Sequence, residues 1–279
     1  PSPAKRERVG ATASRPDLGR PFRNLRLRIL SAAVMIPVAL LAVWLGAWFL
    51  TVLVVLVVAA MEWEWGRLTG GEPLDLKGVL AILTGVSAVV AAAAGWVGAG
   101  IALLGLGTIA VFFAAPSERA WFALGVAWIG AASASFMALA IIAGRPTLLW
   151  LLAVVWASDI GAYAAGRSIG GPKLAPRLSP NKTWAGFLGG LCCAGLVGAL
   201  FGGTGAGPVV VGMSLGLGFV AQLGDLAESF AKRHFKVKDS SHLIPGHGGV
   251  LDRVDSLLAA AVVLAAIMAV EGSSPLLWR

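Results

Sequence analysis

The sequence predicts an all-α, polytopic integral membrane protein with about nine transmembrane helices. Hydrophobic residues make up 58% of its 279 residues. Apolar segments of about 17 to 25 residues recur along the chain, and a helix needs that length to cross ~30 Å of hydrocarbon. Lipid-exposed backbone must satisfy its hydrogen bonds internally, and these segments are too long for barrel strands, so each is expected to be a helix.

The first element is a basic N-terminal tail. Residues 1–28 are rich in Pro, Arg and Ser and hold eight Lys or Arg against two acidic residues, a composition that does not build a packed core. We expect a disordered cytoplasmic tail whose cations set the topology rather than bind a specific ligand. Residues 29–279 are expected to form one transmembrane domain.

The spans follow from apolar length. Residues 29–61 form a run that is too long for one helix, so Gly46 is predicted to separate the first two spans. The later spans are predicted at 78–94, 97–115, 120–143, 147–166, 184–203, 208–231 and 250–270. The 37 glycines and many alanines permit close packing between these helices.

The basic residues predict the orientation. With the tail inside, every Lys and Arg falls on the cytoplasmic side except Arg145 and Arg279, which is the positive-inside bias. We therefore expect a protein integral to the cell (inner) membrane, with its N-terminus and charged loops in the cytoplasm. An odd number of spans places the C-terminus outside.

Residues 229–255 are the most charged segment of the chain, with five Lys or Arg, three Asp and three His. Asp252 and Asp255 are three apart, so a helix that begins at Leu251 places both on one face. Asp225, at the end of the preceding span, could supply a third carboxylate. Hard oxygen ligands of this kind suit Mg²⁺, which phosphates of a substrate then complete.

Cations and glycines of the same segment fit a phosphate ligand. The basic residues are Lys232, Arg233, Lys236, Lys238 and Arg253. The turn at residues 245–249 contains His247, Gly248 and Gly249 and lets backbone N–H groups approach phosphate oxygens. The combination predicts phosphoryl or nucleotidyl transfer. The alternative, a solvated loop that meets anionic lipid, needs neither three Asp nor a Gly-rich turn.

Residues 167–183 form a second basic loop without an acid. Its prolines favour an ordered turn, and Thr183 is predicted to cap the following span, where free N–H groups favour an anion. A basic loop can serve topology alone. We favour phosphate binding by Arg167 and Lys182, of a triphosphate or of a lipid headgroup.

Two acids within apolar segments remain open. Asp159 could pair with Arg167 or with a basic residue of the last loop, or could face substrate. Glu228 is one turn from Lys232, which could satisfy it. The three histidines follow no zinc-binding spacing, and the adjacent Cys192 and Cys193 are interpreted as packing residues.

Both basic loops resemble the signature of the phosphatidate cytidylyltransferase (CDP-diacylglycerol synthase) family. The run KRHFKVKDSSHLIPGHGGVLDRVDS carries the family's Lys-Arg, Lys-Asp, His-Gly-Gly and Asp-Arg-x-Asp elements at their spacings. A second run, from Ser158 to Trp184, is similar to the family's second motif, although Ala185 stands where the family has Glu. Residues 150–256 carry the strong resemblance.

The resemblance, with the residue types, implies transfer of a cytidylyl group from CTP to phosphatidic acid, giving CDP-diacylglycerol and pyrophosphate. Expected catalytic residues are Asp225, Asp252, Lys232 and Arg233. Expected substrate-binding residues are Arg167, Lys173, Ser179, Asn181, Lys182, Thr183, Lys238, Asp239, His247, Gly248, Gly249 and Arg253. Expected metal ligands are Asp225, Asp252 and Asp255, for Mg²⁺, with a second cation left open.

The expected partners are CTP, phosphatidic acid and membrane lipid, and the resemblance implies a homodimer. Nucleic-acid binding is not expected, because the tail and the cytoplasmic loops account for the net charge of +8. A transporter would also place an acid within the membrane, but it does not explain the charges and glycines of one loop. The motif of a CDP-alcohol phosphatidyltransferase is not found, and a non-catalytic scaffold would tolerate loss of the aspartates.

Overall fold

The computed structural model describes residues 20–70, 74–115, 118–202, 207–244, 248–274 and 276, with residues 20–30 and 32 described by their backbone alone. Within these ranges the chain forms nine helices and one two-stranded hairpin. The helices are α1 (Arg20–Leu45), α2 (Ala47–Leu68), α3 (Leu76–Ala93), α4 (Val97–Ala114), α5 (Arg119–Ile142), α6 (Gly144–Ser168), α7 (Trp184–Gly202), α8 (Gly207–His234) and α9 (Leu251–Glu271). The hairpin consists of β1 (Lys173–Ala175) and β2 (Ser179–Thr183).

The prediction of an all-α polytopic membrane protein is confirmed. Eight helices, α2 to α9, are long and apolar enough to cross a membrane, and the described apolar part of α1, Ala33–Leu45, is shorter. The predicted break at Gly46 is also present, since α1 ends at Leu45 and α2 begins at Ala47. Gly46 has a φ of 108°, which glycine adopts without steric cost.

The predicted tail meets the fold at Arg20, where α1 begins. Residues 20–28, which the sequence assigned to the tail, therefore belong to a helix, and residues 1–19 lie outside the described part of the chain. Residues 20–45 continue without a break through Pro37, which lies inside α1.

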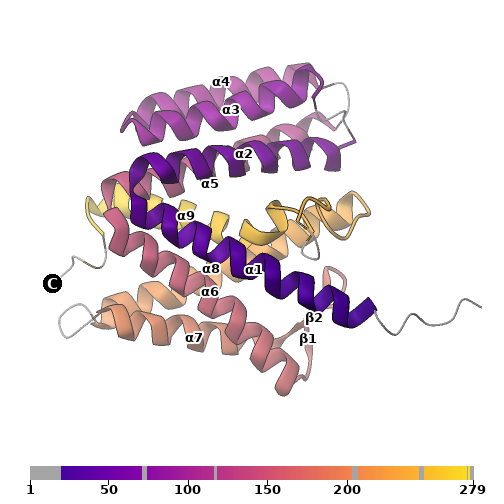
Figure 1. Ribbon diagram of the computed structural model, residues 1–279, viewed down its shortest axis with the longest axis vertical. Helices are drawn as coiled ribbons and strands as arrows, with labels where there is room; N and C mark the ends of the chain where they lie inside the picture. Colours follow the sequence, from indigo (N-terminus) through magenta and orange to yellow (C-terminus); the bar gives the residue numbers. More distant parts are fainter. Residues whose placement is uncertain are drawn as a thin grey trace, which may run out of the picture.

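The helices lie side by side in two groups (Figure 1). In one group α2, α3, α4 and α5 pack on one another, and in the other α6, α7 and α8 do so. Helix α9 lies between the groups and contacts both α5 and α8. The start of α9 therefore stands at the boundary between the two groups.

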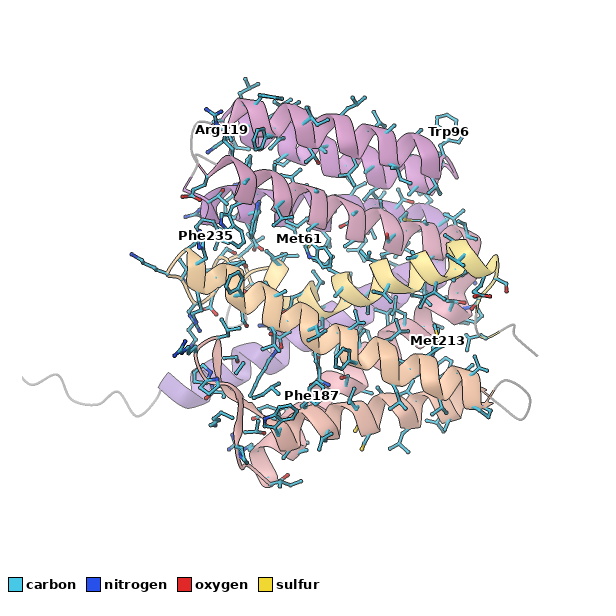
Figure 2. All side chains as sticks on the ribbon, turned by 180° about the vertical axis from the view of Figure 1, so that it is seen from behind. Met61, Trp96, Arg119, Phe187, Met213 and Phe235 are labelled. Carbon is cyan, nitrogen blue, oxygen red and sulfur yellow. The ribbon has the colours of Figure 1, made fainter. Side chains whose placement is uncertain are left out.

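One end of the molecule carries the hairpin, the end of α8 and the start of α9 (Figure 1). Helix α1 also begins at this end, whereas α9 ends at the opposite one (Figure 1). Figure 2 shows Arg119 and Phe235 toward the hairpin end, and Trp96 and Met213 toward the other. Near Phe235, aromatic rings join α8 to the other helix group. Trp121 of α5 stacks on His234 with ring centroids 4.5 Å apart, and Trp65 of α2 meets Phe235 edge to face.

Small residues bring α6 and α7 into backbone contact. A Cβ atom on Gly186 would lie 2.7 Å from the carbonyl oxygen of Ala162, and one on Gly189 would lie 3.0 Å from that of Gly161. This is the close small-residue packing expected from the composition. Because the hairpin joins these two helices, their contact also fixes where the hairpin lies.

This packing predicts a difference between two glycine variants. Gly189→Leu should separate α6 from α7 and destabilise the protein by about 1–3 kcal/mol, the usual cost of overpacking. Gly212→Leu, in α8, should be nearly neutral, because a Cβ atom there meets nothing within 4 Å. Thermal unfolding in detergent is the measurement, and equal melting temperatures for the two variants would contradict the packing described.

Candidate active site

A cavity of about 730 Å³ opens at the hairpin end of the molecule, a volume typical of sites for small ligands. Its walls come from α6, β1, β2, α7, α8, the segment between α8 and α9, and α9. The predicted site residues that line it are Arg167, Asn181, Lys182, Thr183, Asp225, Lys232, Asp239, Asp252, Arg253 and Asp255. Both basic loops of the sequence therefore meet at one cavity.

Helical spacing explains how the spans present these side chains. In α6, Asp159, Tyr163 and Arg167 follow at four-residue intervals, so they share one face. In α8, Gln222 and Asp225 are three apart. Both helices line the cavity only in their C-terminal halves.

Asp252, the second residue of α9, is the most heavily contacted acid of the cavity. Its Oδ1 lies 2.7 Å from Lys232 Nζ. Its Oδ2 accepts three hydrogen bonds, from Ser240 N (2.9 Å), Ser240 Oγ (3.0 Å) and Gly249 N (2.8 Å). Lys232 also bonds Glu228 at 2.8 Å, so the expected pairing of these two residues is present. Such bonds to ionised groups are strong and fix the carboxylate in one orientation.

A second ion pair joins the two loops directly. Lys182 Nζ, on β2, lies 2.6 Å from Asp225 Oδ2, on α8. Both side chains keep partial contact with water, at 24% and 33% exposure. The Lys182 Nζ atom itself is buried against this carboxylate, so a phosphate would have to displace Asp225 to bond it.

The start of α7 turns toward the same cavity. Thr183 Oγ1 accepts a hydrogen bond of 3.1 Å from Gly186 N, so the predicted N-cap is confirmed. Thr183, Gly186 and Phe187 all line the cavity. Free N–H groups at a helix start favour an anion there.

Asp159 takes a position that the sequence left open. It lines the cavity, and Ser256 Oγ lies 3.5 Å from its Oδ1. Within the described residues no ion pair joins it to Arg167, whose guanidinium instead donates to Tyr163 Oη at 3.4 Å. The neighbouring Asp255 accepts a hydrogen bond from Ser256 N at 2.7 Å.

Other predicted residues lie around the cavity rather than in its wall. Arg233 is exposed and donates to two carbonyl oxygens, of Leu178 at 3.2 Å and of Val237 at 2.9 Å. It thus ties the hairpin turn to the end of α8. The remaining ones are Lys173, Ser179, Lys238, Gly248 and Gly249, and His247 lies outside the described residues.

Gly248 and Gly249 leave room for the carboxylate of Asp252. A Cβ atom on Gly248 would lie 2.7 Å from Asp252 Oδ2, and the φ of this glycine is 85°. Gly249 N is itself a donor to that oxygen. Both glycines therefore lie against Asp252, and Gly249 also lies against Glu64.

Glu64 was not assigned a role by sequence reasoning, although it is fully buried next to the site. This residue of α2 accepts hydrogen bonds from Ser240, Ser241, Val250 and Leu251. The available signal was an acid within an apolar span, which is costly without a partner. No local spacing could name its partners, which are 176 to 187 residues away.

The donor chemistry of the cavity fits a hard cation. Asp159, Asp225, Asp252 and Asp255 all line it. Among the residues that the structure describes, no three acids, histidines or cysteines approach closely enough to enclose an ion by themselves. Mg²⁺ ordinarily takes one or two carboxylates and completes its shell with water and substrate phosphates, so two of these acids suffice.

The fold and the cavity define an integral membrane protein with a site lined by acids and cations at one end of its helices. The chain belongs to the cytidylyltransferase family, whose model matches residues 26–270. It is 40% identical over 260 residues to the phosphatidate cytidylyltransferase of Brucella suis biovar 1, covering 86% of this chain and 92% of that protein. It is 36% identical to the phosphatidate cytidylyltransferase of Pseudomonas aeruginosa, covering 89% and 98% of the two chains. The protein of the same name from Rickettsia bellii is 32% identical over 253 residues, with 86% and 89% covered.

Proposed function

We propose that the protein is a phosphatidate cytidylyltransferase, which converts CTP and phosphatidic acid to CDP-diacylglycerol and pyrophosphate in phospholipid biosynthesis. Relatives of this name match over most of both chains. The observation that carries the proposal is the cavity itself, where the two loops of the family signature meet and place Arg167, Lys182, Lys232 and Arg253 around one space.

The reaction needs no general base. The phosphate of phosphatidic acid is already ionised near neutral pH, and one of its oxygens attacks the α-phosphorus of CTP. The bond from that phosphorus to the oxygen bridging the β-phosphorus breaks, and its electron pair leaves with pyrophosphate. The obstacle is repulsion between two polyanions, so catalysis consists of holding them together and neutralising their charge.

The cavity offers cations for this task on opposite walls. Lys182 and Arg167 come from the hairpin and α6, and Lys232 and Arg253 come from α8 and α9. In the structure Lys182 and Lys232 are paired with carboxylates. Substrate phosphates compete for the more exposed Lys182, whereas Lys232, at 12% exposure, stays with Asp252 and Glu228.

We further propose that the enzyme depends on Mg²⁺ held by two of the carboxylates of Asp225, Asp252 and Asp255 together with substrate phosphates. The carboxylates that line the cavity support this, and such an ion would supply Lewis-acid neutralisation of the phosphates. Activity measured against Mg²⁺ concentration after treatment with a chelator tests this proposal.

The proposed orientation places α1's start, both charged loops and the cavity in the cytoplasm, and the C-terminus outside the inner membrane. The end-to-end arrangement in Figure 1 supports it, because the start of α1 lies at the hairpin end and the end of α9 at the other. A homodimer is proposed from the family resemblance and is tested by cross-linking in native membranes.

The deciding experiment is pyrophosphate release by purified protein given CTP and phosphatidic acid. Release should require both substrates and should be lost in Asp225→Asn, with normal extraction and melting. Asp225 is better suited than Asp252 for this purpose, because Asp252 carries four bonds that an amide cannot all accept. Glu271→Gln, exposed at the far end of α9, is the matched control. Near-normal turnover in Asp225→Asn would contradict the assignment.

Two variants of the hairpin loop separate substrate contact from topology. Lys182→Met should lower kcat/KM at least 30-fold, about 2 kcal/mol, because a cation in the cavity wall bonds phosphate there. Arg177→Met removes the same charge from an exposed position outside the wall and should be nearly silent. Equal, small losses of kcat/KM in the two variants would indicate that the loop serves topology alone.

The orientation is tested by cysteine labelling in a cysteine-free background, with Cys192 and Cys193 replaced. A cysteine at Lys173 or Lys238, both exposed at the cavity end, should react only from the cytoplasmic side. One at the exposed Glu271 should react only from outside. Labelling of the Lys238 position from the outer face would reverse the proposed topology.

A further inference from the structure

We propose that Glu64 is a positioning residue that holds the start of α9, and with it Asp252, against the cavity. The proposal rests on the function above only in giving Asp252 a role in turnover. Glu64 belongs to α2, in the helix group opposite α8, and it does not line the cavity. It therefore acts through the residues that it holds, without touching substrate.

One segment of the chain, residues 240–251, supplies the described hydrogen bonds to the carboxylate of Glu64. Its Oε1 accepts hydrogen bonds from Ser241 Oγ at 2.6 Å and from Val250 N at 2.8 Å. Its Oε2 accepts from Leu251 N at 2.8 Å and from Ser240 Oγ at 3.2 Å. The side chain has no exposure to solvent. Three donors, and the Ser240 hydroxyl whose one proton is shared with Asp252, thus satisfy a carboxylate that would otherwise be costly to bury.

Two of these bonds cap α9. The first N–H groups of a helix have no partner inside it, and Val250, the N-cap residue of α9, makes no side-chain cap of its own. Glu64 supplies the missing acceptor from another helix, and its negative charge also suits the positive end of the α9 dipole. Asp252 follows directly after the two capped residues, Val250 and Leu251.

Ser240 connects the two acids. Its hydroxyl lies 3.2 Å from Glu64 Oε2 and 3.0 Å from Asp252 Oδ2, and its backbone N–H donates to the same Asp252 oxygen. Ser241 also donates to Glu64 but has no described bond to Asp252. Asp252 is thus held by the start of α9 and by Ser240, and loss of Glu64 removes a contact that holds each of them.

Gly249 provides the space for this contact. A Cβ atom there would lie 2.6 Å from Glu64 Oε1 and 2.7 Å from its Oε2. A larger residue would push the carboxylate away from the N–H groups that follow. A side chain at Gly249 would also meet Ser240 Oγ, so the contact between Ser240 and Glu64 needs a glycine here.

The chain offers a matched control two residues away. Glu62 lies in the same helix, is equally buried, and has no described hydrogen-bond partner. Its Oε1 faces α3, 3.1 Å from where a Cβ atom of Gly85 would stand. The same Glu→Gln change at positions 62 and 64 therefore distinguishes an effect of the contact with the start of α9 from an effect of changing any buried acid of α2.

The test compares Glu64→Gln and Glu62→Gln in the full-length protein in detergent. The NH₂ group introduced by Glu64→Gln faces groups that are themselves donors, so one of the two accepting positions is lost while the shape of the side chain is kept. We expect kcat to fall at least tenfold in Glu64→Gln, with KM for phosphatidic acid within about twofold of the original. Hydrogen exchange should become faster in peptides covering residues 240–251. Glu62→Gln should change neither quantity.

Serine variants provide an independent arm that decides the matter even if Glu64→Gln fails to fold. Ser240→Ala removes the hydroxyl shared by the two acids, and Ser241→Ala removes one that touches Glu64 alone. The first should lower kcat more than the second. Equal effects of the two serine variants, or of the two glutamate variants, would overturn the proposal.

Failure of the proposed function and failure of the positioning role of Glu64 give different results. If the original protein releases no pyrophosphate from CTP and phosphatidic acid, the proposed function is wrong, and the exchange measurement still tests the contact. If turnover is present but exchange at residues 240–251 is unchanged in Glu64→Gln, the positioning role is wrong and the function stands.

Discussion

Where α8 meets α9, the ammonium of Lys232 lies within 2.8 Å of two carboxylates, those of Glu228 and Asp252, nearly out of contact with water. Removing Lys232 would leave two buried carboxylates side by side without a cation, which is far more costly than losing an exposed ion pair. The two helices are therefore held at one relative position. The cavity wall depends on that position, because Asp225 and Arg253 belong to the same two helices.

The opposite wall is fixed by sterics instead of charge. Glycine and alanine bring α6 and α7 into backbone contact, and the hairpin between them has little freedom to move. Lys182 then reaches across to Asp225. One wall held by buried ions and one held by close packing produce a space that keeps its shape without substrate, and preorganisation of this kind is what electrostatic catalysis requires.

Much of the fold could be predicted from the sequence, because the thickness of the hydrocarbon dictates the length of each span. The break at Gly46 and the cap at Thr183 are local features, and both are present. The site was predicted less completely. Spacing along a helix gives the face of Asp225 or Asp252, but it cannot show that Arg233, at the end of α8, turns outward to two carbonyl oxygens. Glu64 marks the other limit of sequence reasoning, since only the tertiary fold brings α2 to the start of α9. The metal remains a proposal for a similar reason, because its shell would be completed by substrate and not by residues of the chain.

The contact between Glu64 and the start of α9 also has a consequence for biosynthesis. Helix α2 leaves the ribosome long before residues 240–251 exist, and an acid at the centre of a bilayer costs on the order of 3 kcal/mol. Glu64 lies about one turn before the end of α2, and in the proposed orientation this end faces the cytoplasm, where water can bond the carboxylate during this interval. Backbone and side-chain donors of residues 240–251 replace that water only when α9, the last span, inserts. The protein therefore acquires its complete cavity in the final step of its assembly. A nascent chain that stops before α9 lacks part of the cavity wall and leaves Glu64 without the hydrogen bonds from the start of that helix.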